Sequence, residues 1–123
     1  MPLFLLMLKI KSPQTLILEL QMKLLQKLTY INESNIHGKG LFAQTDIPKD
    51  TIIGTLQGRH CDQDGSYVLW LSETDGFEVS CDLKYINHSQ KANACYYDDL
   101  TVVALRHIEQ HEEITHNYET ADW

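Results

Sequence analysis

A chain of 123 residues with 43% apolar side chains can bury one modest hydrophobic core, which excludes a second domain of ordinary size. Residues 1–28 carry four lysines and one glutamate, whereas residues 29–123 carry six basic and sixteen acidic side chains. This acidic body disfavours direct nucleic acid binding and favours a basic protein or peptide as partner. Acidic domains without such a partner are also common, so charge alone does not decide.

The first ten residues and the cysteines indicate the cellular compartment in which the protein works. Residues 1–10 are apolar but are interrupted by Lys9, lack a small-residue cleavage site, and fall short of the roughly 20 apolar residues that span a bilayer. We therefore expect no targeting segment and no membrane span. Three cysteines occur without a C-x-x-C pair, which favours a reducing, intracellular setting over a disulfide framework or zinc site: Cys61, Cys81 and Cys95.

The first predicted element is an amphipathic helix over residues 13–28. Ser12 supplies a capping hydroxyl, and Pro13 suits the first helical position. Apolar residues recur at helical spacing and form a stripe: Ile17, Leu20, Leu24 and Leu28. This stripe could dock on the domain, pair in a homodimer or lie on a membrane surface. We divide the chain into an N-terminal appendage, residues 1–28, and one domain, residues 29–123.

After Tyr30, short apolar runs alternate with turn signals such as Asp64-Gly65, a pattern typical of short strands joined by tight turns. The expected fold class is therefore mainly β, with Trp70 assigned to the core. The candidate strands cover residues 41–43, 51–53, 67–71, 77–79 and 100–105, and a last strand ends at Tyr118.

Several motifs have two interpretations when taken alone. The pair Gly38-x-Gly40 either closes a turn or lets the backbone approach a ligand. The polar stretch over residues 85–94 either satisfies a tight bend or presents groups to a ligand. For Glu112 and Glu113 a solvated pair is favoured over a catalytic carboxylate dyad. The histidines lack partner ligands at suitable spacing, so a metal site is the weakest of the alternatives.

Taken together, the order and spacing of these segments resemble the SET-domain family, from Ser34 to Trp123. The segments that carry the resemblance are residues 34–43 with His37-Gly38-Lys39-Gly40, residues 46–50, the run Tyr85-Ile86-Asn87-His88-Ser89 followed by Asn93, residues 102–108, and residues 112–118. The resemblance implies a SET-domain β-clip fold of small twisted sheets with a knot-like C-terminal threading. It also implies an S-adenosylmethionine-dependent protein-lysine methyltransferase, acting on a basic protein such as a histone tail in the cytoplasm or at nuclear or host chromatin.

The resemblance further assigns roles to individual residues and implies no metal. Tyr118 is the expected catalytic residue. The expected substrate channel contains Tyr96, Tyr97 and His116. The expected S-adenosylmethionine contacts are His37, Gly38, Lys39, Asn87, His88, Tyr118 and Trp123.

The sequence departs from the family pattern at a few positions. Leu56 stands where many members have a tyrosine, a gap that Tyr67, Tyr96 or Tyr97 would have to fill, and His116 stands where Phe or Tyr is usual. Cysteine-rich zinc segments are also absent. A non-catalytic SET-like module that binds a peptide or the cofactor is therefore the alternative function.

Overall fold

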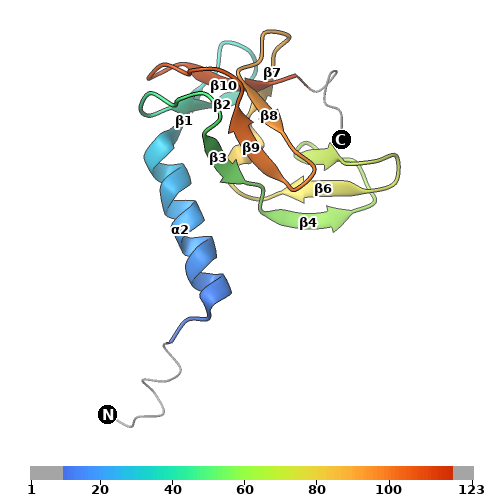
Figure 1. Ribbon diagram of the computed structural model, residues 1–123. Helices are drawn as coiled ribbons and strands as arrows, with labels where there is room; N and C mark the ends of the chain where they lie inside the picture. Colours follow the sequence, from blue (N-terminus) through green and yellow to red (C-terminus); the bar gives the residue numbers. More distant parts are fainter. Residues whose placement is uncertain (1–9, 118–123) are drawn as a thin grey trace.

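The computed structural model describes residues 10–117, a helix followed by two β-sheets (Figure 1). Its mainly β character confirms the expected fold class. The predicted strands agree with the structure to within one or two residues, whereas β1, β4, β7 and β8 were not predicted. The elements are α2 (Pro13–Leu28), β1 (Thr29–Glu33), β2 (Lys39–Ala43), β3 (Ile52–Thr55), β4 (Gly58–Cys61), β5 (Val68–Trp70), β6 (Gly76–Val79), the 3-10 helix η1 (Asp82–Tyr85), β7 (Asn87–His88), β8 (Ala94–Tyr96), β9 (Thr101–Ala104) and β10 (Glu113–His116).

Helix α2 begins and ends where the sequence predicted. The hydroxyl of Ser12 accepts a hydrogen bond from the backbone N–H of Thr15 at 3.1 Å, and Pro13 occupies the first turn. At the other end, the hydroxyl of Thr29 donates to the carbonyl oxygen of Leu25 at 2.6 Å. Because Thr29 is already extended, the chain passes directly from the helix into β1.

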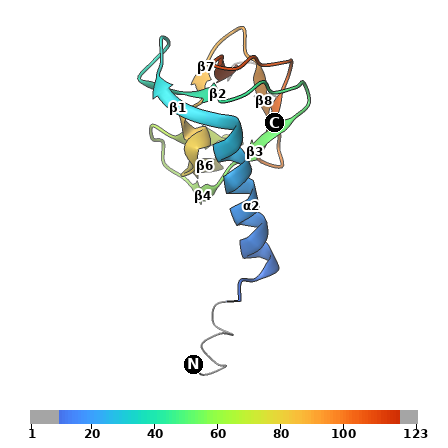
Figure 2. The ribbon, with the colours of Figure 1, turned by 90° about the vertical axis from the view of Figure 1, so that its left-hand side faces the viewer.

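The helix docks through a face that shares only Leu28 with the predicted stripe. Leu25 is buried, and Met22 and Leu28 pack beside it on the core. By contrast, Leu20 and Leu24 are 65% and 47% exposed. Figures 1 and 2 show α2 projecting from the body in two perpendicular views, so only its C-terminal turns contact the sheets. Docking of the predicted stripe was therefore right for Leu28 and wrong for Ile17, Leu20 and Leu24, because the junction with β1 fixes which face meets the core.

Leu25→Ala is expected to lower the free energy of unfolding by about 2 to 4 kcal/mol, since it opens a cavity under the helix. Gln26→Ala, one residue further on an exposed position, serves as control and should change stability by less than about 0.5 kcal/mol. Urea denaturation followed by circular dichroism measures both. Equal effects in the two variants would contradict this packing.

The larger sheet places the last strand in its middle. Its strand order is β1-β2-β10-β8-β9-β3, and β7 also pairs with β10. Strand β10 runs antiparallel to β2, with Ile114 opposite Leu41, and parallel to β7, with Thr115 opposite Asn87. The sheet therefore brings the segment around β2 and the segment around β7 to the same strand. The knot-like threading was expected between residues 87–89 and residues 112–118, and of these only Tyr118 lies outside the described residues.

The smaller sheet, in the order β4-β6-β5, forms the other end of the molecule (Figure 1). Strand β5 is an edge strand that carries Trp70, which is half-buried and donates its indole N–H to the Asp64 carboxylate at 3.2 Å. Assigning Trp70 to the core was therefore wrong. An edge strand with one open face leaves the indole at the surface, where its N–H finds a polar partner.

One hydrophobic core joins the helix end, the larger sheet and η1. Within residues 10–117, no helix combines the length and apolar character that a bilayer crossing requires. Fully buried side chains of this core include one from each of β2, β3, η1, β9 and β10, and two from the bridge between residues 47 and 108: Leu41, Ile53, Leu83, Val102, Ile114, Ile47 and Ile108.

Candidate functional site

A cavity of about 660 Å³ opens where the turn before β2 meets η1 and β7. This volume lies in the range of pockets that hold small organic ligands. Five residues predicted to bind the cofactor line it, although they come from two segments far apart in the chain: His37, Gly38, Lys39, Asn87 and His88. The remaining lining residues are Ile36, Ser66, Tyr67, Lys84, Tyr85 and Ile86.

The side-chain amide of Asn87 ties these two segments together. Its Nδ2 lies 3.0 Å from the carbonyl oxygen of His37 and 3.2 Å from that of Lys39. It also lies 3.1 Å from the hydroxyl of Ser34 and 3.0 Å from Oε2 of Glu113. Two amide hydrogens thus serve four acceptors. The contacts fix the turn before β2 against both β7 and β10.

Glu113 is the second member of this polar cluster. The hydroxyl of Ser34 lies 2.9 Å from each of its carboxylate oxygens. Its neighbour Glu112 accepts hydrogen bonds from Arg106 and from Asn93, and the bond from Arg106 is the main cause that lowers the pKa of Glu112. The expectation of a solvated pair was therefore wrong, because each carboxylate is held by partners from another segment.

The two glycines of the turn have separate structural causes. Gly38 adopts φ +47°, in the left-handed region that favours glycine, and a Cβ there would meet open space. At Gly40, a Cβ would lie 2.5 Å from Oε2 of Glu113 and 2.9 Å from its Cδ. Gly38 therefore shapes the turn, and Gly40 lets the carboxylate of Glu113 approach the strand.

Gly40→Ala is expected to destabilise the fold by about 1 to 3 kcal/mol, because the added methyl group displaces Glu113 from Ser34 and Asn87. The penalty should shrink by at least about 1 kcal/mol when Glu113→Ala is made in the same chain. A double-mutant cycle by thermal and urea unfolding measures this coupling. Additive effects would show that Gly40 is not needed for the carboxylate.

Asn93 holds β10 from the other side. Its side chain is 1% exposed, accepts from the backbone N–H of Thr115 at 2.9 Å and donates to the carbonyl oxygen of Glu113 at 2.8 Å. The backbone N–H of Ser89 donates to the carbonyl oxygen of His116 at 3.1 Å. Residues 87–94 therefore wrap around the last strand, and a buried asparagine replaces a missing backbone partner.

Comparison with known families identifies the fold that carries this cavity. The family model described as SET domain matches residues 38–119, which span both the Gly38-Lys39-Gly40 turn and the Asn87-His88 strand. The chain belongs to the SET-domain family. SET domains are in general lysine methyltransferases that use S-adenosylmethionine. No curated protein gives a significant match to the chain.

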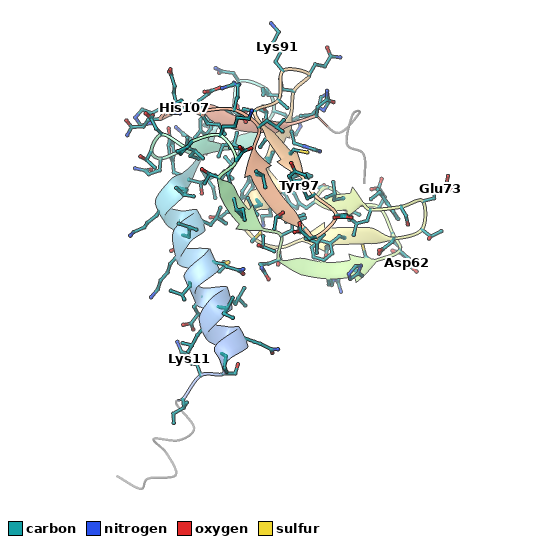
Figure 3. All side chains as sticks on the ribbon, in the orientation of Figure 1. Lys11, Asp62, Glu73, Lys91, Tyr97 and His107 are labelled. Carbon is teal, nitrogen blue, oxygen red and sulfur yellow. The ribbon has the colours of Figure 1, made fainter. Side chains whose placement is uncertain are left out.

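The residues of this SET domain predicted to line the substrate channel fall into two groups. Tyr96 and His116 are buried and adjacent, with ring centres 4.1 Å apart. Tyr97 is 47% exposed at the turn after β8 (Figure 3), because successive side chains of a strand point to opposite faces. The structure thus brings together Tyr96 and His116 but not Tyr97.

Burial lowers the pKa of His116, and nearby His88 lowers it further against the opposing effect of the Ala94 carbonyl. His116 is therefore neutral at pH 7 and adds no positive charge beside Tyr96.

Some residues of the site lie beyond or outside the predictions. Tyr118 and Trp123 fall outside the described residues, so their roles stay predictions. Tyr67, Lys84 and Tyr85 line the cavity and were not predicted to bind the cofactor. Tyr85 lies two positions before Asn87 in the sequence, which is a signal for its place. Tyr67 was considered only as a replacement for the tyrosine missing at Leu56, not as a cofactor contact.

The lining of the cavity fits S-adenosylmethionine in chemical type. The rings of Tyr67 and Tyr85 line the cavity beside the ammonium group of Lys84. Lys84 offers positive charge to a carboxylate, and Gly38 leaves the backbone open to close approach. Among residues 10–117, no three histidine, cysteine, aspartate or glutamate side chains gather as metal ligands.

Proposed function

We propose that this SET domain is a protein-lysine N-methyltransferase that acts on a basic protein or peptide, such as a histone tail. The meeting of the turn over residues 37–39 with Asn87 and His88 in one cavity carries this proposal. The family match supports it independently. The proposal places the protein inside the cell, in the cytoplasm or at nuclear or host chromatin, where lysine-rich tails occur.

The residues of the site would hold the cofactor and align it. When bound, S-adenosylmethionine supplies a methyl group on a positively charged sulfur. Asn87 keeps the turn over residues 37–39 in place, and the rings of Tyr67 and Tyr85 face the cavity. Direct displacement needs alignment and exclusion of water more than covalent help. A preorganised turn meets that need.

The target lysine must present a neutral amine, because its lone pair forms the new N–C bond as the C–S bond breaks. Surroundings of low polarity favour the neutral form of an amine. The buried pair Tyr96 and His116 would provide such surroundings. Tyr118 would orient the amine with its hydroxyl, and the proton is released to solvent. The sixteen acidic side chains of residues 29–123 would attract a basic substrate.

Purified protein with labelled S-adenosylmethionine is expected to methylate lysines in histones or other basic proteins. Tyr118→Phe should lower the rate by about a hundredfold, because an orienting hydroxyl is lost, while cofactor affinity stays the same. Tyr30→Phe, which removes an exposed hydroxyl bonded to His111, serves as control with full activity. Methylation assays and calorimetry measure these effects, and unchanged turnover in Tyr118→Phe would reject the assigned role.

A non-catalytic SET-like binding module is the second candidate. Leu56 is 3% exposed and belongs to the core, so it supplies no hydroxyl to a channel. If the wild-type protein binds S-adenosylmethionine or a basic peptide but marks no lysine in basic proteins or cell lysate, this second function replaces the first.

We also propose that two copies pair through α2. Its outer face exposes Ile17, Leu20 and Leu24, and its lysines would face the acidic body of a second copy. This charge complementarity favours another copy of the chain over an unrelated partner.

Leu20→Glu is expected to convert a dimer into a folded monomer, because it places a charge in the apolar contact. Sedimentation velocity over a concentration series measures the change, and Gln26→Glu on an exposed polar position of α2 is the control. A wild-type protein that stays monomeric at every concentration would contradict the pairing.

A further inference from the structure

Two residues of the cavity lining come from the loop that joins β4 to β5 in the smaller sheet. The rest of the described lining belongs to residues 36–39 and 84–88, whereas Ser66 and Tyr67 belong to this loop. The ring of Tyr67 meets the ring of Tyr85 edge to face, with ring centres 5.9 Å apart. The β4–β5 loop therefore supplies part of the cavity wall from outside the larger sheet.

The side chains of Asp64 and Trp70 tie the two ends of this part of the wall together. Oδ1 of Asp64 accepts a hydrogen bond from the indole Nε1 of Trp70 at 3.2 Å and another from the backbone N–H of Gly65 at 2.9 Å. The bond from the indole spans six residues, and Ser66 and Tyr67 lie between its ends. The two lining residues therefore belong to a segment that a side-chain hydrogen bond closes.

The backbone holds the two lining residues unequally. The carbonyl oxygen of Tyr67 accepts a hydrogen bond from the N–H of Val79 in β6 at 3.0 Å, which attaches Tyr67 to the smaller sheet. Before Tyr67, the N–H of Val68 donates to the carbonyl oxygen of Gly65 at 3.3 Å, which is long for such a bond. A carboxylate acceptor makes the side-chain tie the stronger restraint on that half of the segment.

We propose that Trp70 and Asp64 are positioning residues for the methyl donor, an inference that rests on the proposed function. Neither belongs to the described lining of the cavity, so both act through the segment between them. Their hydrogen bond keeps Ser66 and the ring of Tyr67 in place before a ligand arrives. A wall that is already ordered loses less conformational freedom on binding, and the ligand binds more tightly for that reason.

Calorimetry of the full chain with S-adenosylmethionine tests this assignment. Trp70→Phe keeps an aromatic ring but removes the donor, so it should weaken binding about threefold to tenfold. Asp64→Ala removes the acceptor and should weaken binding equally, whereas Asp64→Asn keeps an acceptor oxygen and should bind as the wild type does. In steady-state assays, Trp70→Phe should raise the KM for the donor and leave kcat unchanged.

Arg59→Ala is the matched control, because it removes a 2.9 Å hydrogen bond to Glu78 elsewhere in the same sheet. Its affinity for S-adenosylmethionine should stay within about twofold of the wild-type value. The double variant of Trp70→Phe and Asp64→Ala should bind no more weakly than either single variant, because both changes remove the same bond. Thermal unfolding of each variant confirms that a lost affinity does not come from a lost fold.

The outcomes separate this inference from the proposed function. If Trp70→Phe and Asp64→Ala bind S-adenosylmethionine as tightly as the wild type, or if Arg59→Ala weakens binding equally, the inference fails while the proposed function stands. Additive losses in the double variant, or a loss in Asp64→Asn, would also overturn it. If the wild-type protein does not bind S-adenosylmethionine, both fail.

Discussion

The hydrogen bonds between Asn87, Glu113 and Ser34 are the interaction on which the candidate site depends. They join a turn, a two-residue strand and the last strand of the sheet at one point. Each group is partly buried, so removing one leaves the others without partners, at a cost greater than one ordinary hydrogen bond. The side-chain amide of Asn87 also donates hydrogen bonds to the carbonyl oxygens of His37 and Lys39. It therefore holds the turn that forms part of the cavity wall.

The cavity lining and the domain as a whole carry charge of opposite sign. The carboxylates near the site already accept hydrogen bonds, Glu113 from Ser34 and Asn87, and Glu112 from Arg106. The described lining of the cavity contains Lys39 and Lys84 and no carboxylate, whereas residues 29–123 as a whole have an excess of acidic side chains. The cavity lining is therefore electropositive within a domain that is acidic as a whole.

Local signals predicted α2 and six of the ten strands of the described residues, but not which of their faces would be buried. The Ser12-Pro13 cap located α2 to the residue, because capping is decided within one turn. The face of α2 that docks depends on where β1 leads the chain, which no helical period encodes. The run around Asn87 predicted two residues of the cavity lining, Asn87 and His88, since its polar residues are consecutive. Tyr67 entered the site through pairing of the smaller sheet, and only the three-dimensional fold reveals such a position.

The central place of β10 also decides when this protein can fold. Strand β2 is synthesised early, yet one of its two edges is completed only by residues 113–116. Contacts so distant in sequence form slowly, because a long loop must close before they contribute. Until then Leu41 and the rest of β2 present an unpaired strand edge, which invites aggregation. A chain stopped before Glu113 therefore lacks both a finished sheet and the carboxylate that accepts hydrogen bonds from Ser34 and Asn87.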